Sequence, residues 1–410
     1  MKKIPLYLQI LIALVLGILA GTFLPETTKY YSWVGTLFMN ALCLLIVPII
    51  FLSVSLSVVE IGSGGQGGLK RIGAKTVFWY VATMLLAVVT GVLLVRFIRP
   101  GAGVTVPAAE VPELVTSTSV TDIISGFIPS NVFYAFAHNN TIPVIFLALV
   151  VGIAVPKLSD KSREVLTLGM KSAYELTMRI TRAVISLSPF GIFAIVAGQF
   201  AAISDVLLML RNMLFYVITV AAGLAIHTFI TLPLLLRLVG RVRPGAHLRN
   251  MSVPMITAFS TASSGATLPL TLDAVEKKDG VSRRIADFVV SLGATVNMNG
   301  AALLECVAVI FISQVYGVEL TLVQTVLICF LSLMCAIGAA GIPMSAMVMM
   351  AIILSAVGLP VEGIGLVIGV DRILDMLRTA VNVYGDTCIA VLVAKSEKES
   401  LSIDIKQQNQ

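Results

Sequence analysis

A charged segment near the carboxyl end of the chain lies inside a hydrophobic run. Residues 371–386, DRILDMLRTAVNVYGD, contain three aspartates and two arginines, and the surrounding apolar run extends from about residue 364 to residue 393. A charge in the middle of a bilayer costs about 2.5 kcal/mol or more, even on the most lenient insertion scales. Such a cluster is therefore expected to serve a function, such as binding a ligand or an ion.

The polar residues of this segment follow one another at steps of one, three or four. On a helix, positions with this spacing share one face. They are Asp371, Asp375, Arg378, Thr379, Asn382 and Asp386. An aspartate and an arginine one turn apart can hold the ammonium and a carboxylate of one zwitterionic ligand. In the alternative interpretation, Asp375 and Arg378 only neutralise each other and hold helices together. Ligand binding is favoured, because simple pairing does not require the other polar residues on the same face.

The composition is that of a helical membrane protein. Hydrophobic residues make up 58% of the 410 residues, charged residues make up 12%, and the mean hydropathy is +0.99. Soluble domains are roughly 45–50% apolar and about 25% charged. Long unbroken apolar runs, rather than short alternating strands, exclude a transmembrane β-barrel. We therefore predict an all-α membrane protein with no large soluble domain.

Apolar runs predict eight transmembrane helices, near residues 5–24, 34–61, 76–98, 121–156, 168–202, 205–236, 285–315 and 364–393. The fourth of these is interrupted at Pro129 and by the sequence HNNTIP. The first resembles a signal peptide but lacks a clear small-x-small cleavage site, so we expect it to stay in the chain. If each run crosses once, most basic loops fall on one side, which the positive-inside rule assigns to the cytoplasm. Both termini are then cytoplasmic. Arg96 and Arg99 contradict the rule at the outer end of the third helix, where snorkelling is the only explanation.

Two later segments are too interrupted to be simple spans. STASSGATLP breaks the apolar run between residues 253 and 274, and GAAGIPMSA breaks the run between residues 323 and 357. Each predicts a re-entrant hairpin with its tip at membrane depth, which is tolerated only where the backbone lines a cavity. The first would enter from the cytoplasm and the second from outside, so hairpin plus helix forms an inverted repeat. Paired interrupted segments of this kind mark the binding site of many transporters.

Four ordered motifs resemble the dicarboxylate/amino acid:cation symporter family, which includes the excitatory glutamate transporters and the archaeal aspartate transporters. They are the serine-rich tip at 263–265, Asn-Met-x-Gly at 297–300, Gly-Ile-Pro at 341–343 and the segment at 371–386. The resemblance covers essentially the whole chain. Further matches are VPIIF at 47–51, RPGAG at 99–103 and SPFGIFA at 188–194.

The resemblance implies a homotrimer in the plasma membrane, which is the cell inner membrane in bacteria. Each protomer would have a scaffold domain and a transport domain that moves like an elevator. By this resemblance the scaffold comprises residues 1–70 and 106–203, the transport domain residues 71–105 and 204–396, and a cytoplasmic tail residues 397–410. It also implies cation-coupled import of acidic amino acids, with H⁺ or Na⁺ as coupling ions and no cofactor.

The substrate site can be argued from side-chain chemistry beside the resemblance. Hairpin tips expose unsatisfied N–H groups of helix N-termini, which suit a ligand's α-carboxylate, although serines there could simply be helix caps. Asp375 suits the ammonium, and Arg378 suits a side-chain carboxylate through two parallel hydrogen bonds. The predicted substrate-binding residues are Ser263, Ser264, Ile342, Pro343, Met344, Ser345, Asp375, Arg378, Thr379 and Asn382.

The sodium sites implied by the resemblance are only partly matched. Relatives read Asn-Met-Asp-Gly-Thr where this chain has an amide at Asn299, and an archaeal serine is replaced by Met84. A thioether is a poor ligand for a hard cation, so we expect this site to be lost although Tyr80 and Thr83 match it. The family's other acidic sodium site is matched by Asn297, Asn382 through its backbone, and Asp386.

Glu305 occupies the position at which proton-coupled relatives carry a glutamate. An isolated glutamate among apolar neighbours favours its neutral form and could therefore carry a proton. Permanent pairing with a nearby arginine is the alternative. The chain departs from its relatives in three further places: Ala262 and Met376 stand where relatives carry an arginine, and Ala301 replaces a threonine. Arg372 either replaces a missing arginine or pairs with Asp371.

Four functions remain open. The leading one is a symporter for glutamate or aspartate, coupled to protons, sodium or both. A carrier for C4-dicarboxylates such as succinate is disfavoured by Asp375, and a carrier for neutral amino acids is disfavoured by Arg378. An anion channel is the remote alternative. The scattered three histidines and five cysteines predict no metal site, disulfide framework or catalytic set, so neither an enzyme nor a nucleic-acid-binding protein is expected.

Overall fold

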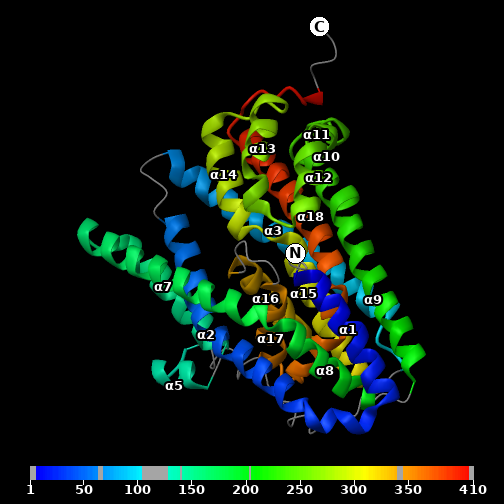
Figure 1. The fold of residues 1–410 in the computed structure, drawn as a ribbon. Coiled ribbons are helices and arrows are strands. Elements are labelled where there is room, and N and C mark those ends of the chain that lie inside the picture. Colours follow the sequence, from blue (N-terminus) through cyan, green and yellow to red (C-terminus); the bar gives the residue numbers. More distant parts are fainter. Residues whose placement is uncertain are drawn as a thin grey trace, which may run out of the picture.

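Helices make up nearly all of the computed structural model, which describes residues 6–62, 68–103, 128–138, 141–202, 205–338 and 345–405 (Figure 1). The first half contains α1 (Leu6–Phe23), α2 (Ser32–Gly62), α3 (Gly68–Ile98), α5 (Val132–Ala137), α6 (Thr141–Ala154), α7 (Asp160–Ser186), α8 (Ser188–Ala202) and α9 (Val206–Ile226). The second half contains α10 (Leu232–Leu238), α11 (Pro244–Asn250), α12 (Ser252–Thr261), α13 (Ser264–Lys277), α14 (Arg283–Val296), α15 (Asn299–Val315), α16 (Leu322–Gly338), α17 (Ser345–Ala356) and α18 (Ile368–Ser396). Short 3-10 or π turns are η1 (Pro25–Tyr30), η2 (Val155–Lys157), η3 (His227–Thr231) and η4 (Val361–Leu366).

The predicted all-α membrane fold is confirmed at this coarse level. Within the described ranges, five helical stretches are long and apolar enough to cross a membrane, or six if the bent pair of α7 and α8 forms one span. α1 and α6 are apolar but shorter. The count of eight spans therefore stays a prediction.

The predicted single helix near residues 168–202 is wrong. The chain instead forms α7 and α8, which meet at Leu187 with a bend of 55°. Pro189 explains the break, because proline has no N–H to donate and its ring clashes with the carbonyl one turn earlier. α7 begins already at Asp160 and extends away from the other helices (Figure 1).

The helices pack in two groups that share a long boundary. α1 packs along α8, and α2 packs along α6, α7 and α8. In the second group α3 and α9 pack along α15, while α12, α13, α14 and α15 surround α18. α2 also touches α16 and α17, so the two groups meet there.

The centre of the second group is formed by α15 and α18. All residues of α15 except Gln314 are buried, as expected for a helix that is apolar all round. α18 is also mostly buried, although it carries the charged segment. The fold therefore places the charges predicted from the sequence deep inside protein rather than against lipid.

Two helices, α12 and α13, form the first predicted hairpin. They contact each other and have 10 and 14 residues, which is shorter than the roughly 20 residues a transmembrane helix needs. Ala262 makes the turn between them with φ +49°, a left-handed conformation that costs a non-glycine residue about 1–2 kcal/mol. α16 and α17 form the limbs of the second, and its tip at residues 339–344 lies outside the described residues. The re-entry of both segments into a membrane stays a prediction.

The carboxyl-terminal segment at 397–405 is tied to the second group of helices. Glu397 pairs with Arg71 and, at 2.6 Å, with Lys75, and these hydrogen bonds lower the pKa of Glu397 to about 2. Further on, the carbonyl of Ile403 accepts from the Arg243 N–H at 2.8 Å. The start of the predicted cytoplasmic tail therefore packs across α3 and the link between α10 and α11.

Candidate functional site

The polar residues that share one face of α18 form the centre of the candidate site. All six of the predicted residues on this face, Asp371, Asp375, Arg378, Thr379, Asn382 and Asp386, are buried. They are brought against the break between α14 and α15, where Gly300 fits closely on the backbone of Arg378. A side chain at position 300 would collide with Arg378, so this glycine allows the two helices to approach.

Asp375 and Arg378 form a buried ion pair. Nε and Nη2 of Arg378 each lie 2.8 Å from Oδ1 of Asp375. The structure therefore contains the internal pairing that the sequence left as an alternative. That pairing leaves capacity for a ligand, since neither Nη1 of Arg378 nor Oδ2 of Asp375 has a hydrogen-bond partner among the described residues. The two interpretations are compatible.

Arg372 lies beside this pair. Its Nη1 is 3.5 Å from Oδ2 of Asp375, and its side chain is 37% exposed. The sequence did not decide the partner of Arg372, and the structure places it near Asp375. Asp375 therefore faces two guanidinium groups.

Two further acids are buried near Arg378. Glu305 on α15 and Asp371 on α18 are almost completely buried, and none of their carboxylate oxygens has a hydrogen-bond partner within the described ranges. Both are close enough to Arg378 for their charges to interact with it. No salt bridge between Glu305 and an arginine is found in the described part of the chain. Permanent pairing of Glu305 with an arginine stays the alternative, and the proton dependence of uptake tests it.

The break between α14 and α15 is fastened to α18 by two amide side chains. Nδ2 of Asn297 donates to Oδ1 of Asp386 at 2.8 Å, and the N–H of Gly300 donates to Oδ1 of Asn382 at 2.8 Å. Oδ1 of Asn297 is buried and has no donor among the described residues. The three residues of the predicted sodium site, Asn297, Asn382 and Asp386, therefore lie together, and Oδ1 of Asn297 has no hydrogen-bond partner there among the described residues. An oxygen of this kind suits a hard cation. The side-chain oxygen of Asn382, however, is already used.

The second sodium site of relatives corresponds to contacts between α3 and α15. The hydroxyl of Thr83 lies 3.4 Å from Oδ1 of Asn299, and Met84 is fully buried in the same turn of α3. The hydroxyl of Tyr80 donates to the carbonyl of Val289 instead of pointing to Asn299. The groups offered here are an amide, a hydroxyl and a thioether, with no carboxylate among them.

The serines of the first hairpin lie at the start of α13. Oγ of Ser263 accepts from the N–H of Ala266 at 3.2 Å, so Ser263 caps α13. Its part in substrate binding stays a prediction. Ser264 is buried. Of the second tip, Ile342, Pro343 and Met344 lie outside the described residues, and Ser345 is the first residue of α17.

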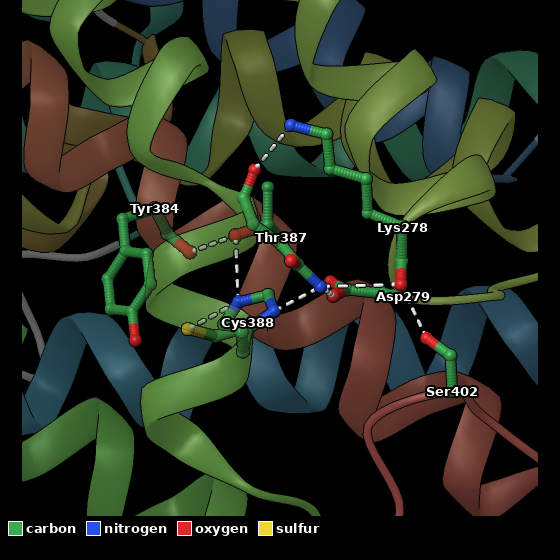
Figure 2. Close-up of polar contacts among 8 residues, drawn as sticks. Lys278, Asp279, Tyr384, Thr387, Cys388 and Ser402 are labelled. Carbon is green, nitrogen blue, oxygen red and sulfur yellow. Dashed lines mark hydrogen bonds and ion pairs between the residues drawn. The ribbon is translucent and has the colours of Figure 1, made fainter.

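A buried polar network on the far side of Asp386 was missed by sequence reasoning, which took the histidines as scattered structural residues. Nδ1 of His247 donates to Oδ2 of Asp279 at 2.7 Å, and Nε2 lies 3.1 Å from the hydroxyl of Thr387. Figure 2 labels Asp279 and Thr387, which these two contacts connect. Asn250 donates to Oδ1 of Asp279 at 2.8 Å. His247 and Asp279 are fully buried, and they join both ends of the first hairpin to α18. Their separation of 32 residues follows no recognised motif, so nothing in the sequence identifies the pair.

We expect His247 and Asp279 to depend on each other. Leucine at either position should destabilise the protein by about 3–5 kcal/mol, because it leaves the other polar group buried without its partner. The double variant should lose less than the sum of the two single losses. Denaturation of the purified protein measures this cycle, and strictly additive losses would show that the two side chains are independent.

Comparison with known proteins places these residues in a family context. The model of a family described as the sodium:dicarboxylate symporter family matches residues 6–396. Excitatory amino acid transporter 3 of Oryctolagus cuniculus is 32% identical over 98% of this chain and 88% of its own length. A proton/sodium-glutamate symport protein of Bacillus caldotenax is 30% identical over 97% of this chain and 96% of its own length. An excitatory amino acid transporter of Caenorhabditis elegans is 32% identical over 95% of this chain.

Proposed function

Because the chain belongs to the sodium:dicarboxylate symporter family, we propose that it is a secondary active symporter for glutamate or aspartate, coupled to protons, sodium or both. Members of this family are transporters rather than enzymes. The observation that carries the substrate assignment is the buried Asp375–Arg378 pair, in which Oδ2 of Asp375 and Nη1 of Arg378 make no hydrogen bond with the described residues. A zwitterion with a second carboxylate complements this pair, because its ammonium can donate to Asp375 and its second carboxylate can accept from Arg378.

The geometry supports one arrangement of the substrate's charged groups among the residues of the site. The substrate's ammonium lies at Oδ2 of Asp375, and its side-chain carboxylate takes the free Nη1 of Arg378. The α-carboxylate then lies toward the N-terminus of α13, where N–H groups and the helix dipole favour an anion. Thr379 lies one residue beyond Arg378 and Asn382 one turn later, and both add polar contacts.

One observation favours a second candidate, a C4-dicarboxylate. Arg372 lies near Asp375 and partly neutralises it, so the site contains two guanidinium groups for two carboxylates. A dicarboxylate could bind both arginines through its two carboxylates, whereas an amino acid needs an ionised Asp375 to bind its ammonium.

Asp375→Asn separates these candidates. Without the anionic partner, glutamate binding should weaken by about 2 kcal/mol or more, whereas succinate binding should change little or improve. Direct binding of labelled glutamate and of labelled succinate to the purified protein, in the variant and in wild type, measures both affinities. Equal losses for the two ligands would make Asp375 a packing residue.

Proton and cation coupling are assigned to different residues. Glu305 carries the proton, because its buried carboxyl has no hydrogen bond among the described residues and a lone buried charge is very costly. Asp386, with Asn297 and Asn382, holds sodium. Asn299, Thr83 and Met84 bind no sodium, because none of these three residues provides an anionic oxygen.

The transport movement follows the two groups of helices. The scaffold, residues 1–70 and 106–203, includes the group formed by α1, α2, α6, α7 and α8. The transport domain, residues 71–105 and 204–396, includes α3 and the helices around α15 and α18. It moves as an elevator with the bound substrate, and residues 397–410 follow it as the cytoplasmic tail.

The assembly is a homotrimer in the plasma membrane with both termini in the cytoplasm. The projecting helix α7 supports this arrangement, since its apolar residues Val165, Leu168, Leu176 and Ile180 are exposed in the single chain. An exposed apolar face on a helix requires lipid or another subunit to cover it.

A further inference from the structure

We propose that a cavity at the end of α3 is a second ligand site, which binds small molecules that carry both anionic oxygens and an ammonium group. It lies between the end of α3 and the turn that joins α15 to α16, and its volume is about 510 Å³. Ligand pockets usually measure roughly 300–1,000 Å³. The proposal rests on the proposed topology, in which this end of α3 is external. It is separate from the site on α18.

Two arginines dominate the polar lining. The side chains that matter are Arg96, Arg99, Ser313, Gln314 and Glu319. Arg96 and Arg99 contradict the positive-inside rule, and snorkelling was the only explanation that the sequence offered. The structure supplies a second explanation, because both arginines line the same cavity.

The wall of the cavity is rigid. Oε1 of Gln314 accepts from the N–H of Gly101 at 3.0 Å, and its Nε2 donates to the carbonyl of Val95 at 3.1 Å. A β-carbon at Gly101 would lie 2.6 Å from that of Gln314, so only glycine fits there. These contacts fix the turn after α3 against α15.

Arg99 is held at this turn in an unfavourable conformation. Its φ is +48°, in the left-handed region, which costs about 1–2 kcal/mol for a residue with a β-carbon. Its guanidinium makes no hydrogen bond or ion pair with the described residues, whereas Arg96 donates to the hydroxyl of Thr325. Strained residues persist where the surrounding structure fixes them, often at ligand sites.

The charges define the ligand. Two guanidinium groups favour carboxylate or phosphate oxygens, and Glu319, which lines the same cavity, repels a simple anion but favours an ammonium. An acidic amino acid in the external solution has this combination, and so does the phosphoethanolamine headgroup of a lipid. The amino acid would be concentrated beside the transporter before it enters the central site.

The test uses the full-length protein with its central site disabled by Arg378→Ala. In nanodiscs made only of phosphatidylcholine, labelled glutamate should still bind weakly and saturably. Adding R96Q and R99Q should weaken this binding at least about tenfold, the effect of one lost charge-assisted hydrogen bond. R99Q alone should act in the same direction and R99K should restore binding. The matched control is R211Q, an exposed arginine on α9 that is not part of the cavity and should have no effect.

A second arm tests the lipid. Protein purified from membranes that contain phosphatidylethanolamine should retain that lipid in native mass spectrometry, and R96Q with R99Q should release it, if the headgroup is the occupant. E319Q should weaken the binding of either ligand, because both ligands carry an ammonium. The site is disproved if neither ligand responds to the arginine variants. Glutamate uptake by wild-type protein is measured separately, so a failure of the transport assignment would be distinguished from a failure of this site.

Discussion

Arg378→Ala is expected to abolish uptake of glutamate and aspartate while the protein keeps its fold. Arg378 is buried, and its pairing with Asp375 leaves Nη1 without a hydrogen-bond partner among the described residues, so Nη1 can donate to a substrate carboxylate. Loss of a buried charged partner should weaken substrate binding by about 2–5 kcal/mol, which is roughly 30-fold or more. Uptake of labelled glutamate and aspartate into proteoliposomes measures the loss, and size-exclusion chromatography verifies the assembly.

Arg372→Ala is the matched control. Arg372 also lies near Asp375, but at 3.5 Å and partly exposed, so its removal should have a much smaller effect on glutamate. Arg378→Ala should also relax selectivity, because the site loses the guanidinium proposed to hold the side-chain carboxylate and can accept neutral amino acids. Unchanged glutamate affinity in Arg378→Ala would refute the substrate assignment.

Glu305→Gln should remove the proton dependence of uptake and leave substrate exchange intact. The amide has nearly the shape of a protonated carboxyl, but it cannot release a proton. Exchange needs only binding and movement of the transport domain, whereas net proton-linked import needs the empty carrier to return after releasing its proton inside. Uptake under an imposed pH gradient, compared with exchange of labelled for unlabelled glutamate, separates the two processes.

Asp386→Asn serves as the companion variant. It should keep the pH response and lose the response to sodium, because Asp386 provides the only carboxylate among the three residues of the predicted sodium site. If Glu305→Gln still concentrates glutamate in response to a pH gradient, the proton is carried elsewhere. Asp371 would then be the first candidate, since it is buried near Arg378 and neither of its oxygens has a hydrogen-bond partner among the described residues.

The central helix and its site were predictable because their signals are local. A charge in an apolar run and a spacing of three or four residues are visible in a single segment, and α18 has the predicted face. The tip of the first hairpin was equally visible, since a serine-rich turn interrupts two helices that are too short to span a membrane.

Features that depend on packing between distant segments were not predictable. The buried pair of His247 and Asp279 forms only when both ends of the first hairpin meet α18. The partner of Arg372 depends on a choice among rotamers that spacing alone cannot make. The bend at Leu187 was missed for a different reason, because apolar composition outweighed the signal of Pro189.

The most direct test is uptake of labelled glutamate, aspartate and succinate into proteoliposomes, with sodium and proton gradients imposed one at a time. The proposed function predicts that glutamate or aspartate accumulates above its external concentration when an inward proton gradient, sodium gradient or both are present, and that uptake saturates. Equilibration without accumulation under every gradient would contradict a symporter and indicate a channel. Accumulation of succinate alone would contradict the assignment of an amino acid substrate.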